Sequence, residues 1–227
     1  MTSTHHPGES WGDVTANRTL IIETATAACS VALIEGATVV ARAHETVGRG
    51  HAERLVPMIA ALPDGGRADA ILVDVGPGSF TGIRVGLAAA RGLGLGWGVP
   101  VHGFSSLALI AAAAFAADPS LARLAVVLEG GHGEVFMQPF AADPFAAIAD
   151  LASLTPADAL ARLDGMAAIG NGVRFLTALN PMIDAREALP DAAAAPLLPA
   201  DFTALPPSPL YGRAPDAKPM AAKEPIG

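Results

Sequence analysis

Short apolar runs, each closed by a polar residue, follow the first 18 residues of the chain. Aliphatic and β-branched residues dominate these runs, and a Glu35-Gly36 pair separates the last two, which is typical of a hairpin. We therefore predict three strands, at 19–22, 29–34 and 38–43. The period then changes, because apolar residues recur at helical spacing between 44 and 62, which predicts an amphipathic helix that Pro57 kinks or loosens.

A strand that is apolar except for Asp74 is predicted at 70–75, and it enters a Gly-Pro-Gly turn from which a helix leaves over 82–98. Ser79 or Thr81 suits the N-cap of that helix. Interior glycines lower helix stability by about 0.5–1 kcal/mol each relative to alanine, and this helix holds four of them, at 86, 92, 94 and 96. We therefore expect it to press closely against the sheet on one side and against something else, such as a partner subunit, on the other. Packing within the chain alone is the alternative, because small residues also serve helix-on-sheet contacts.

The second half of the chain repeats the layout of the first. A strand at 101–104 and an alanine-rich helix at 107–117 separate the two halves. A strand at 124–128 then closes on Glu129, a glycine-rich turn follows, and the next strand runs over 134–140, just as Glu23 closes the first strand of the chain. This repetition predicts two lobes related by duplication. Weaker signals predict helices at 155–163 and 173–179 around a Gly-Asn-Gly turn.

Composition restricts the class of protein. The 227 residues are 52% hydrophobic and 16% charged, which is sufficient apolar material for a core. The net charge of −8 makes the chain a poor independent binder of RNA or of anionic membrane. Cys29 is the single cysteine, so an intramolecular disulfide is excluded. The N-terminus does not have the pattern of a signal peptide and the longest apolar run, 107–117, is too short to span a bilayer, so we expect a cytoplasmic protein.

Candidate chemistry gathers at the Gly-Pro-Gly turn. Glycines there let a phosphate approach the backbone, and the amides of a helix N-terminus favour an anion. The candidate phosphate-binding residues are Gly76, Gly78, Ser79 and, in the turn after the first strand, Thr24. The loop fits neither a dinucleotide fingerprint, nor a P-loop, nor a nucleophile elbow. A purely structural turn with a capped helix is the alternative.

The run Gly-Pro-Gly-Ser-Phe-Thr-Gly-Ile-Arg-Val-Gly at 76–86, with Gly-Phe-Ser-Ser-Leu at 103–107, resembles the bacterial TsaB (YeaZ) family over about 20–107. Members are non-catalytic partners in threonylcarbamoyladenosine modification of tRNA. The resemblance implies an α/β fold of the actin-like ATPase (ASKHA, ribonuclease H-like) type, with two lobes, each a mixed sheet with flanking helices, and the second lobe reduced. We assign the lobes to 19–104 and 105–213, between a disordered extension at 1–18 and a flexible tail at 214–227.

Several positions retain or depart from the family pattern. The usual Asp-Thr-Ser opening reads Glu23-Thr24-Ala25, and an arginine usual in the second lobe is absent from 129–136, although Gly133-Glu134-Val135 is retained. Tyr211 and Arg213 match the family's closing motif. The catalytic sister family, TsaD, has a metal-binding His-x-x-x-His, whereas here His51 is followed four residues later by Leu55. We therefore expect no catalytic metal on this chain.

The resemblance implies a scaffold that binds and activates a TsaD-like subunit, with a TsaE-like ATPase in the same complex and tRNA contacted only indirectly. A homodimer is the other assembly considered. No intrinsic cofactor is expected, and ATP or ADP would bind at the partner junction. The residues assigned to partner binding are His51, Arg54, Leu55, Met58, Leu87, Arg91 and Leu95.

Two other functions compete with the scaffold. A stand-alone actin-like kinase or ATPase needs acidic groups for Mg²⁺, for which Glu23, Asp74 and Glu129 are candidates. A metallopeptidase, suggested by the older glycoprotease label of the wider family, ranks last because it needs the second histidine of the metal site.

Overall fold

The computed structural model describes residues 18–210. The extension predicted at 1–18, apart from Arg18, lies outside the described residues. So do the predicted tail at 214–227 and the family residues Tyr211 and Arg213. Within the described range, no helix combines the length and hydropathy that a membrane span requires.

The first lobe is built on a five-stranded sheet in the order β3-β2-β1-β4-β5. The first three strands are antiparallel neighbours, whereas β4 and β5 run parallel to β1. β1 and β4 are apolar on both faces, as expected of strands that are covered on both sides. The strands are β1 (Arg18–Glu23), β2 (Ala28–Glu35), β3 (Thr38–Thr46), β4 (Ala70–Asp74) and β5 (Val101–Phe104).

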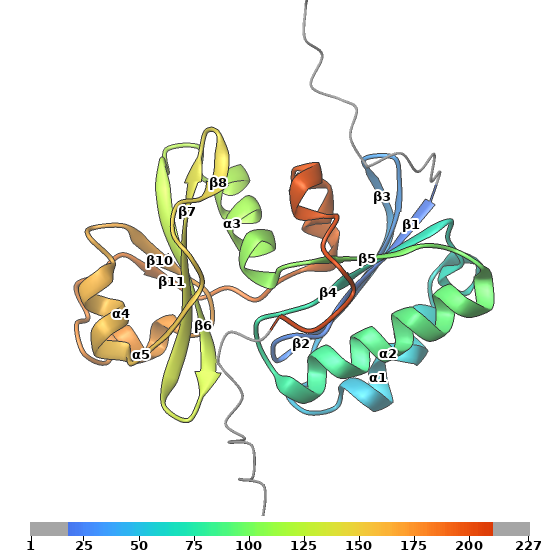
Figure 1. The fold of residues 1–227 in the computed structure, drawn as a ribbon, viewed down its shortest axis with the longest axis horizontal. Helices are drawn as coiled ribbons and strands as arrows, with labels where there is room; N and C mark the ends of the chain where they lie inside the picture. The colour runs from blue at the N-terminus through green and yellow to red at the C-terminus, as the bar shows by residue number, and fades with distance from the viewer. Residues whose placement is uncertain (1–17, 211–227) are drawn as a thin grey trace, which may run out of the picture.

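Two helices, α1 (His51–Ala60) and α2 (Phe80–Trp97), cover one face of this sheet side by side (Figure 1). The helix predicted from 44 begins only at His51, because residues 44–46 still pair with β2. Pro57 lies inside α1, and the helix continues through it. The Ser79 hydroxyl caps α2 by accepting from the amide of Gly82 at 3.2 Å, and Gly98 ends α2 in the left-handed conformation.

The second lobe repeats the first, as predicted. Its sheet has the order β11-β10-β6-β7-β8, with β9 also paired to β7. Again the first strand of the lobe, β6, has an antiparallel neighbour, β7, on one side and a parallel neighbour, β10, on the other, and β8 extends the antiparallel side by pairing with β7. The elements are β6 (Arg123–Gly131), β7 (Glu134–Ala142), β8 (Phe145–Ala147), β9 (Ala152–Leu154), α4 (Pro156–Arg162), β10 (Ala167–Ile169), α5 (Val173–Thr177) and β11 (Ala185–Arg186). The predicted two lobes, each a mixed sheet with flanking helices, are thus confirmed.

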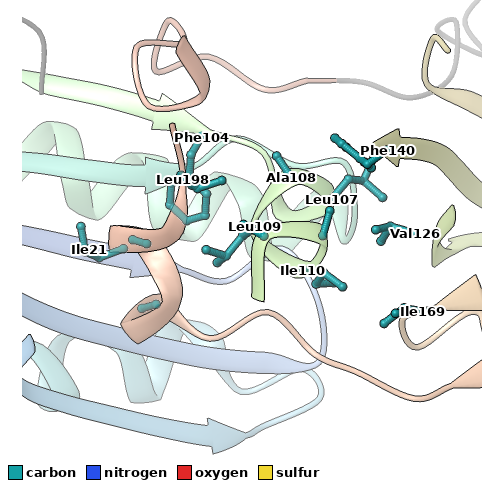
Figure 2. Packing of buried hydrophobic residues seen from close by; sticks show 14 of the residues in the cluster. Ile21, Phe104, Leu107, Ala108, Leu109, Ile110, Val126, Phe140, Ile169 and Leu198 are labelled. Carbon is teal, nitrogen blue, oxygen red and sulfur yellow. The ribbon is translucent and has the colours of Figure 1, made fainter. Parts of the chain in front are cut away.

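Helix α3 (Ser106–Ala117) lies between the two sheets (Figure 1). It is apolar on every side, so it packs against both lobes at once. Figure 2 shows Leu107 and Ile110 directed toward the second sheet, whereas Leu109 lies on the side of the first. One hydrophobic cluster therefore runs continuously from Ile21 on β1 through α3 to Phe140 on β7.

The C-terminal segment returns to the first lobe, which the sequence did not predict. The short helices η2 (Ala192–Leu197) and η3 (Ala200–Phe202) follow β11, and η2 packs against β1, β2 and β3. Leu205 then exchanges two backbone hydrogen bonds with Gly103 at the edge of β5, and the amide of Leu210 donates to the carbonyl of Val75 at 2.7 Å. The range 105–213 assigned to the second lobe therefore includes a segment that covers the first sheet.

Candidate functional site

The candidate site lies where β1 and β4 end side by side. The register of the two parallel strands pairs Ile22 with Val73, so the next residues, Glu23 and Asp74, are neighbours across the sheet. The turn 24–27 leaves β1 and the loop 76–79 leaves β4. The sequence motif and the family's acidic position thus meet at one edge of the first sheet.

Glycines allow the loop to pack directly on the turn. A side chain at Gly78 would overlap the carbonyl oxygen of Ala25, and one at Gly82 would overlap the carbonyl oxygen of Thr24. The Ser79 amide donates to the Ala25 carbonyl at 2.6 Å. The turn and the loop are therefore in backbone contact, and no layer of side chains separates them.

The predicted phosphate donors are largely engaged within the chain. The buried Thr24 hydroxyl donates to the carbonyl of Gly82 at 2.8 Å, and the Gly76 amide donates to Asp74 Oδ1 at 2.6 Å. The Ser79 amide is used by Ala25. This geometry explains the motif as a close-packed structural turn, whereas a nucleotide at a partner junction stays a prediction.

Glu23 and Asp74 form a buried acidic pair beneath the loop. Each gives one oxygen to a backbone amide of its own turn, that of Ala25 at 2.7 Å and that of Gly76 at 2.6 Å. The other oxygens, Glu23 Oε2 and Asp74 Oδ2, are buried and make no hydrogen bond. Burial, together with the nearby Asp74, raises the pKa of Glu23 well above its ordinary value, and burial raises the pKa of Asp74 to about 7.

The corresponding acid of the second lobe has a different environment. Glu129 is exposed and forms an ion pair with Arg174 at 2.6 Å, while its amide donates to the side chain of Asn171. Within residues 18–210, no group of three or more His, Cys, Asp or Glu side chains gathers closely enough to hold a metal ion. The three acids named for a stand-alone kinase therefore do not converge in the described chain.

Four of the seven residues assigned to partner binding are buried: His51, Leu55, Met58 and Leu87. His51 Nε2 lies 2.9 Å from the carbonyl oxygen of Ala28, which ties α1 to β2. The other three belong to the core of the first lobe. Because these four side chains are buried, a partner could not contact them at the surface of this chain. The predicted partner-binding residues are therefore reduced to the three that remain, which are described next.

Arg54, Arg91 and Leu95 remain exposed. Arg54 pairs with Glu45 across the surface at 2.9 Å, and Arg91 donates to the carbonyl of Pro207 at 2.6 Å. Leu95 is 88% exposed, although it is a large apolar side chain. Leu95 is therefore the strongest candidate of the three for burial by another chain.

Other large apolar side chains on α1 and α2 are exposed as well. Val56 on α1 is 62% exposed and Phe80 on α2 is 58% exposed, and the guanidinium of Arg84 lies over the Phe80 ring at 3.4 Å. Sequence reasoning passed over these three, although Phe80 and Arg84 are four residues apart on one helical stripe. We call this surface the outer helix face; it comprises Val56, Phe80, Arg84, Ala88, Arg91, Gly92, Leu95 and Gly96.

Comparisons with known proteins agree with the architecture. The model of the family described as "TsaD: tRNA N6-adenosine threonylcarbamoyltransferase" matches residues 41–176. An Escherichia coli (strain K12) protein named "tRNA threonylcarbamoyladenosine biosynthesis protein TsaB" is 38% identical over 132 residues, and the match covers 56% of this chain. The match also covers 56% of that protein, so the chain spans about half the length of this relative.

Longer matches exist as well. An uncharacterized protein of Mycobacterium tuberculosis (strain ATCC 25618 / H37Rv) is 33% identical over 213 residues, which cover 89% of this chain and 94% of that protein. The structure described as YeaZ from Pseudomonas aeruginosa superimposes with a TM-score of 0.71 at 26% identity, and the superposition covers 86% of this chain and 99% of that one. The similarity therefore extends through both lobes.

Proposed function

The chain belongs to the TsaB (YeaZ) family of tRNA threonylcarbamoyladenosine biosynthesis, and from that membership we propose that it is a non-catalytic subunit that binds and activates a TsaD-like partner. The partner would transfer the threonylcarbamoyl group to the adenosine next to the anticodon. The acidic chain would contact tRNA only through that partner, because a net charge of −8 opposes direct binding of RNA.

The outer helix face is the single observation that carries this proposal. Gly92 and Gly96 lie inside α2, yet a Cβ at either position would meet no atom within 4 Å. No contact within the chain therefore requires glycine at these two positions, although each glycine lowers helix stability by about 0.5–1 kcal/mol. Small residues beside the exposed Leu95 and Phe80 allow a helix of another chain to approach closely.

The engaged turn supports the non-catalytic part of the proposal. Thr24, Gly76 and Ser79 use their donors within the chain, and the Glu23 and Asp74 carboxyl groups lie buried beneath them. A substrate would have to displace these contacts to reach the acids. We therefore propose that ATP or ADP and the TsaE-like ATPase associate at the partner junction, and that two copies of the isolated chain pair through the same outer helix face.

Leu95→Glu is expected to weaken the complex with the TsaD-like subunit from the same source by at least about 30-fold, because a buried apolar anchor of an interface is typically worth about 2 kcal/mol or more. The measurement is titration calorimetry of the two purified subunits, with co-elution on size exclusion as a second readout. Threonylcarbamoyl transfer to tRNA should fall in parallel at subunit concentrations near the dissociation constant.

Met182→Glu is the matched control, because Met182 has the same 88% exposure but lies in the second lobe. It is expected to leave binding unchanged. Equal binding by the Leu95→Glu variant and the wild type would overturn the proposed surface. Magnesium-dependent ATP hydrolysis by the isolated chain would instead support the stand-alone ATPase.

A further inference from the structure

The buried acidic pair at the ends of β1 and β4 has a feature that the scaffold role does not explain. Glu23 and Asp74 are 0% and 1% exposed, and each has one oxygen without a hydrogen-bond partner. The two side chains adjoin, because Glu23 and Asp74 directly follow the paired residues Ile22 and Val73 of two neighbouring parallel strands, and the ionisation of each affects that of the other. Two ionised carboxylates in this position would combine desolvation with direct repulsion, which is among the least favourable arrangements of charge in a protein interior.

Among the described residues, the charged groups that act on the ionisation of the pair are the two acids themselves and Asp191. The basic side chains Arg42 and His44 of β3 lie 3.9 and 4.0 Å from the carboxylate of Asp191. From β2, Ser30 is the residue in register with Glu23, so its hydroxyl lies on the same face of the sheet. The thiol of the adjacent Cys29 stays neutral because burial and the nearby Glu23 raise its pKa to about 11. The crossover before η2 contributes Asp191, a further negative charge that disfavours ionisation of Glu23. Helix α3 contains no titratable residue, and the buried face of α2 consists of glycine, alanine and aliphatic side chains. The neighbours whose hydrogen bonding favours the ionised form of Asp74 are Gly76, Glu23 and, at the start of α3, Ser106.

We propose that Glu23 and Asp74 share one proton, and that this proton holds the turn 24–27 against the loop 76–79 as a pH-sensitive lock. Proton sharing satisfies both orphaned oxygens with one hydrogen bond, as in other close carboxyl pairs. Within residues 18–210, no third His, Cys, Asp or Glu side chain completes a metal-binding group with the pair, so we assign a proton to this position in place of a metal ion.

The lock connects several elements because each carboxyl group is also bonded to its own loop. Glu23 holds the Ala25 amide and Asp74 holds the Gly76 amide, so the shared proton joins the backbone of the turn to that of the loop. The same loop continues into the cap of α2, and its Pro77 carbonyl accepts from the Ser106 hydroxyl of α3 at 2.9 Å. Loss of the proton would therefore loosen the first turn of α2 and the start of the helix between the lobes.

The sign of the pH dependence follows from the raised pKa values of both carboxyl groups. An acid whose pKa is higher in the folded state binds its proton more tightly there than in the unfolded chain. Its contribution to stability is full below the ordinary values of 3.8 and 4.5, and is lost as the pH rises through about 7. The lock should thus be closed in mild acid and weakened in mild base.

The experiment compares thermal unfolding at pH 5 and pH 8 for the wild type, Glu23→Gln and Glu129→Gln. The wild-type midpoint should fall by at least about 4 °C between the two pH values, which corresponds to about one unit of pKa shift in a chain of this size. Glu23→Gln should remove most of this fall, because its amide donates to Asp74 at either pH. Glu129→Gln changes the equivalent, exposed acid of the second lobe and should retain the fall.

Equal pH dependence in the wild type and Glu23→Gln would overturn the proposal. Stabilisation of the wild type by Mg²⁺ or K⁺ at pH 8 that Glu23→Gln abolishes would also overturn it, in favour of a bound cation. Should Glu23→Gln fail to fold, carboxyl ¹³C NMR titration of the wild type decides. A transition near or above pH 7 would support the shared proton, and titration of both groups near their ordinary values would refute it.

Discussion

Gly82→Ala is expected to destabilise the protein by about 3 kcal/mol, at the upper end of what overpacking typically produces. Gly82 lies in the first turn of α2, and an added Cβ would overlap the backbone oxygen of Thr24. If the obstacle were the end of a flexible side chain, it could move aside, but it is a backbone oxygen. It belongs to the turn 24–27, which is also held by the hydrogen bond from the Ser79 amide to the Ala25 carbonyl. Relief therefore requires α2 to move away from the end of β1, with loss of the bond from the Thr24 hydroxyl.

Gly92→Ala provides the matched control in the same helix. A Cβ at Gly92 would meet nothing within 4 Å, so the substitution should stabilise the isolated chain by about 0.5–1 kcal/mol through helix propensity. Chemical denaturation followed by circular dichroism measures both variants. If Gly92→Ala destabilised the chain as much as Gly82→Ala, the prediction would be wrong. The side of α2 that carries Gly92 would then be packed against other residues in the isolated chain.

Leu109→Ala is expected to lower the free energy of unfolding by about 2–5 kcal/mol, the range for a buried leucine whose cavity cannot collapse. Leu109 is fully buried in α3, in the cluster that joins Ile21 of the first lobe to Phe140 of the second (Figure 2). Since one cluster serves both lobes, the loss should act on the whole chain. The variant should unfold in a single transition at lower temperature.

Differential scanning calorimetry and tryptophan fluorescence test this prediction together. In a Trp11→Phe background, the fluorescence of Trp97, at the end of α2, reports on the first lobe only, whereas calorimetry records the whole chain. The two methods should give the same midpoint for the Leu109→Ala variant. Leu95→Ala, on the exposed outer helix face, should change stability by no more than about 0.5 kcal/mol. Two separate calorimetric transitions, of which only one moves, would contradict a shared core.

The sequence was most informative where local signals decide the structure. The Ser79 cap and the Gly98 end of α2 follow from short-range hydrogen bonding and backbone conformation. The repeated layout around Glu23 and Glu129 predicted two lobes, and the two sheets confirm it. The strands β8, β9 and β11 were missed because each has only two or three residues, in alanine-rich surroundings without a clear period.

Contacts between residues far apart in the chain could not be predicted from the sequence. Glu23 and Asp74 were identified as separate acids, but their contact depends on the parallel register of β1 and β4. His51 and Leu55 were assigned to partner binding because the sequence does not show that one face of α1 packs into the core of the first lobe. The return of η2 to the first sheet joins residues more than 150 positions apart, as in the bond from the Ala192 amide to the Ser30 hydroxyl.

That return has a consequence for synthesis on the ribosome. The strands of the first sheet leave the exit tunnel early, but the short helix that covers their inner face comes from residues 192–197, near the end of translation. In the meantime α3 emerges with apolar side chains on every side and no second lobe to receive it. The nascent chain therefore exposes a sheet face and a helix that are typical targets of chaperones. A chain stalled before Leu198 is expected to be a chaperone client and not a folded lobe.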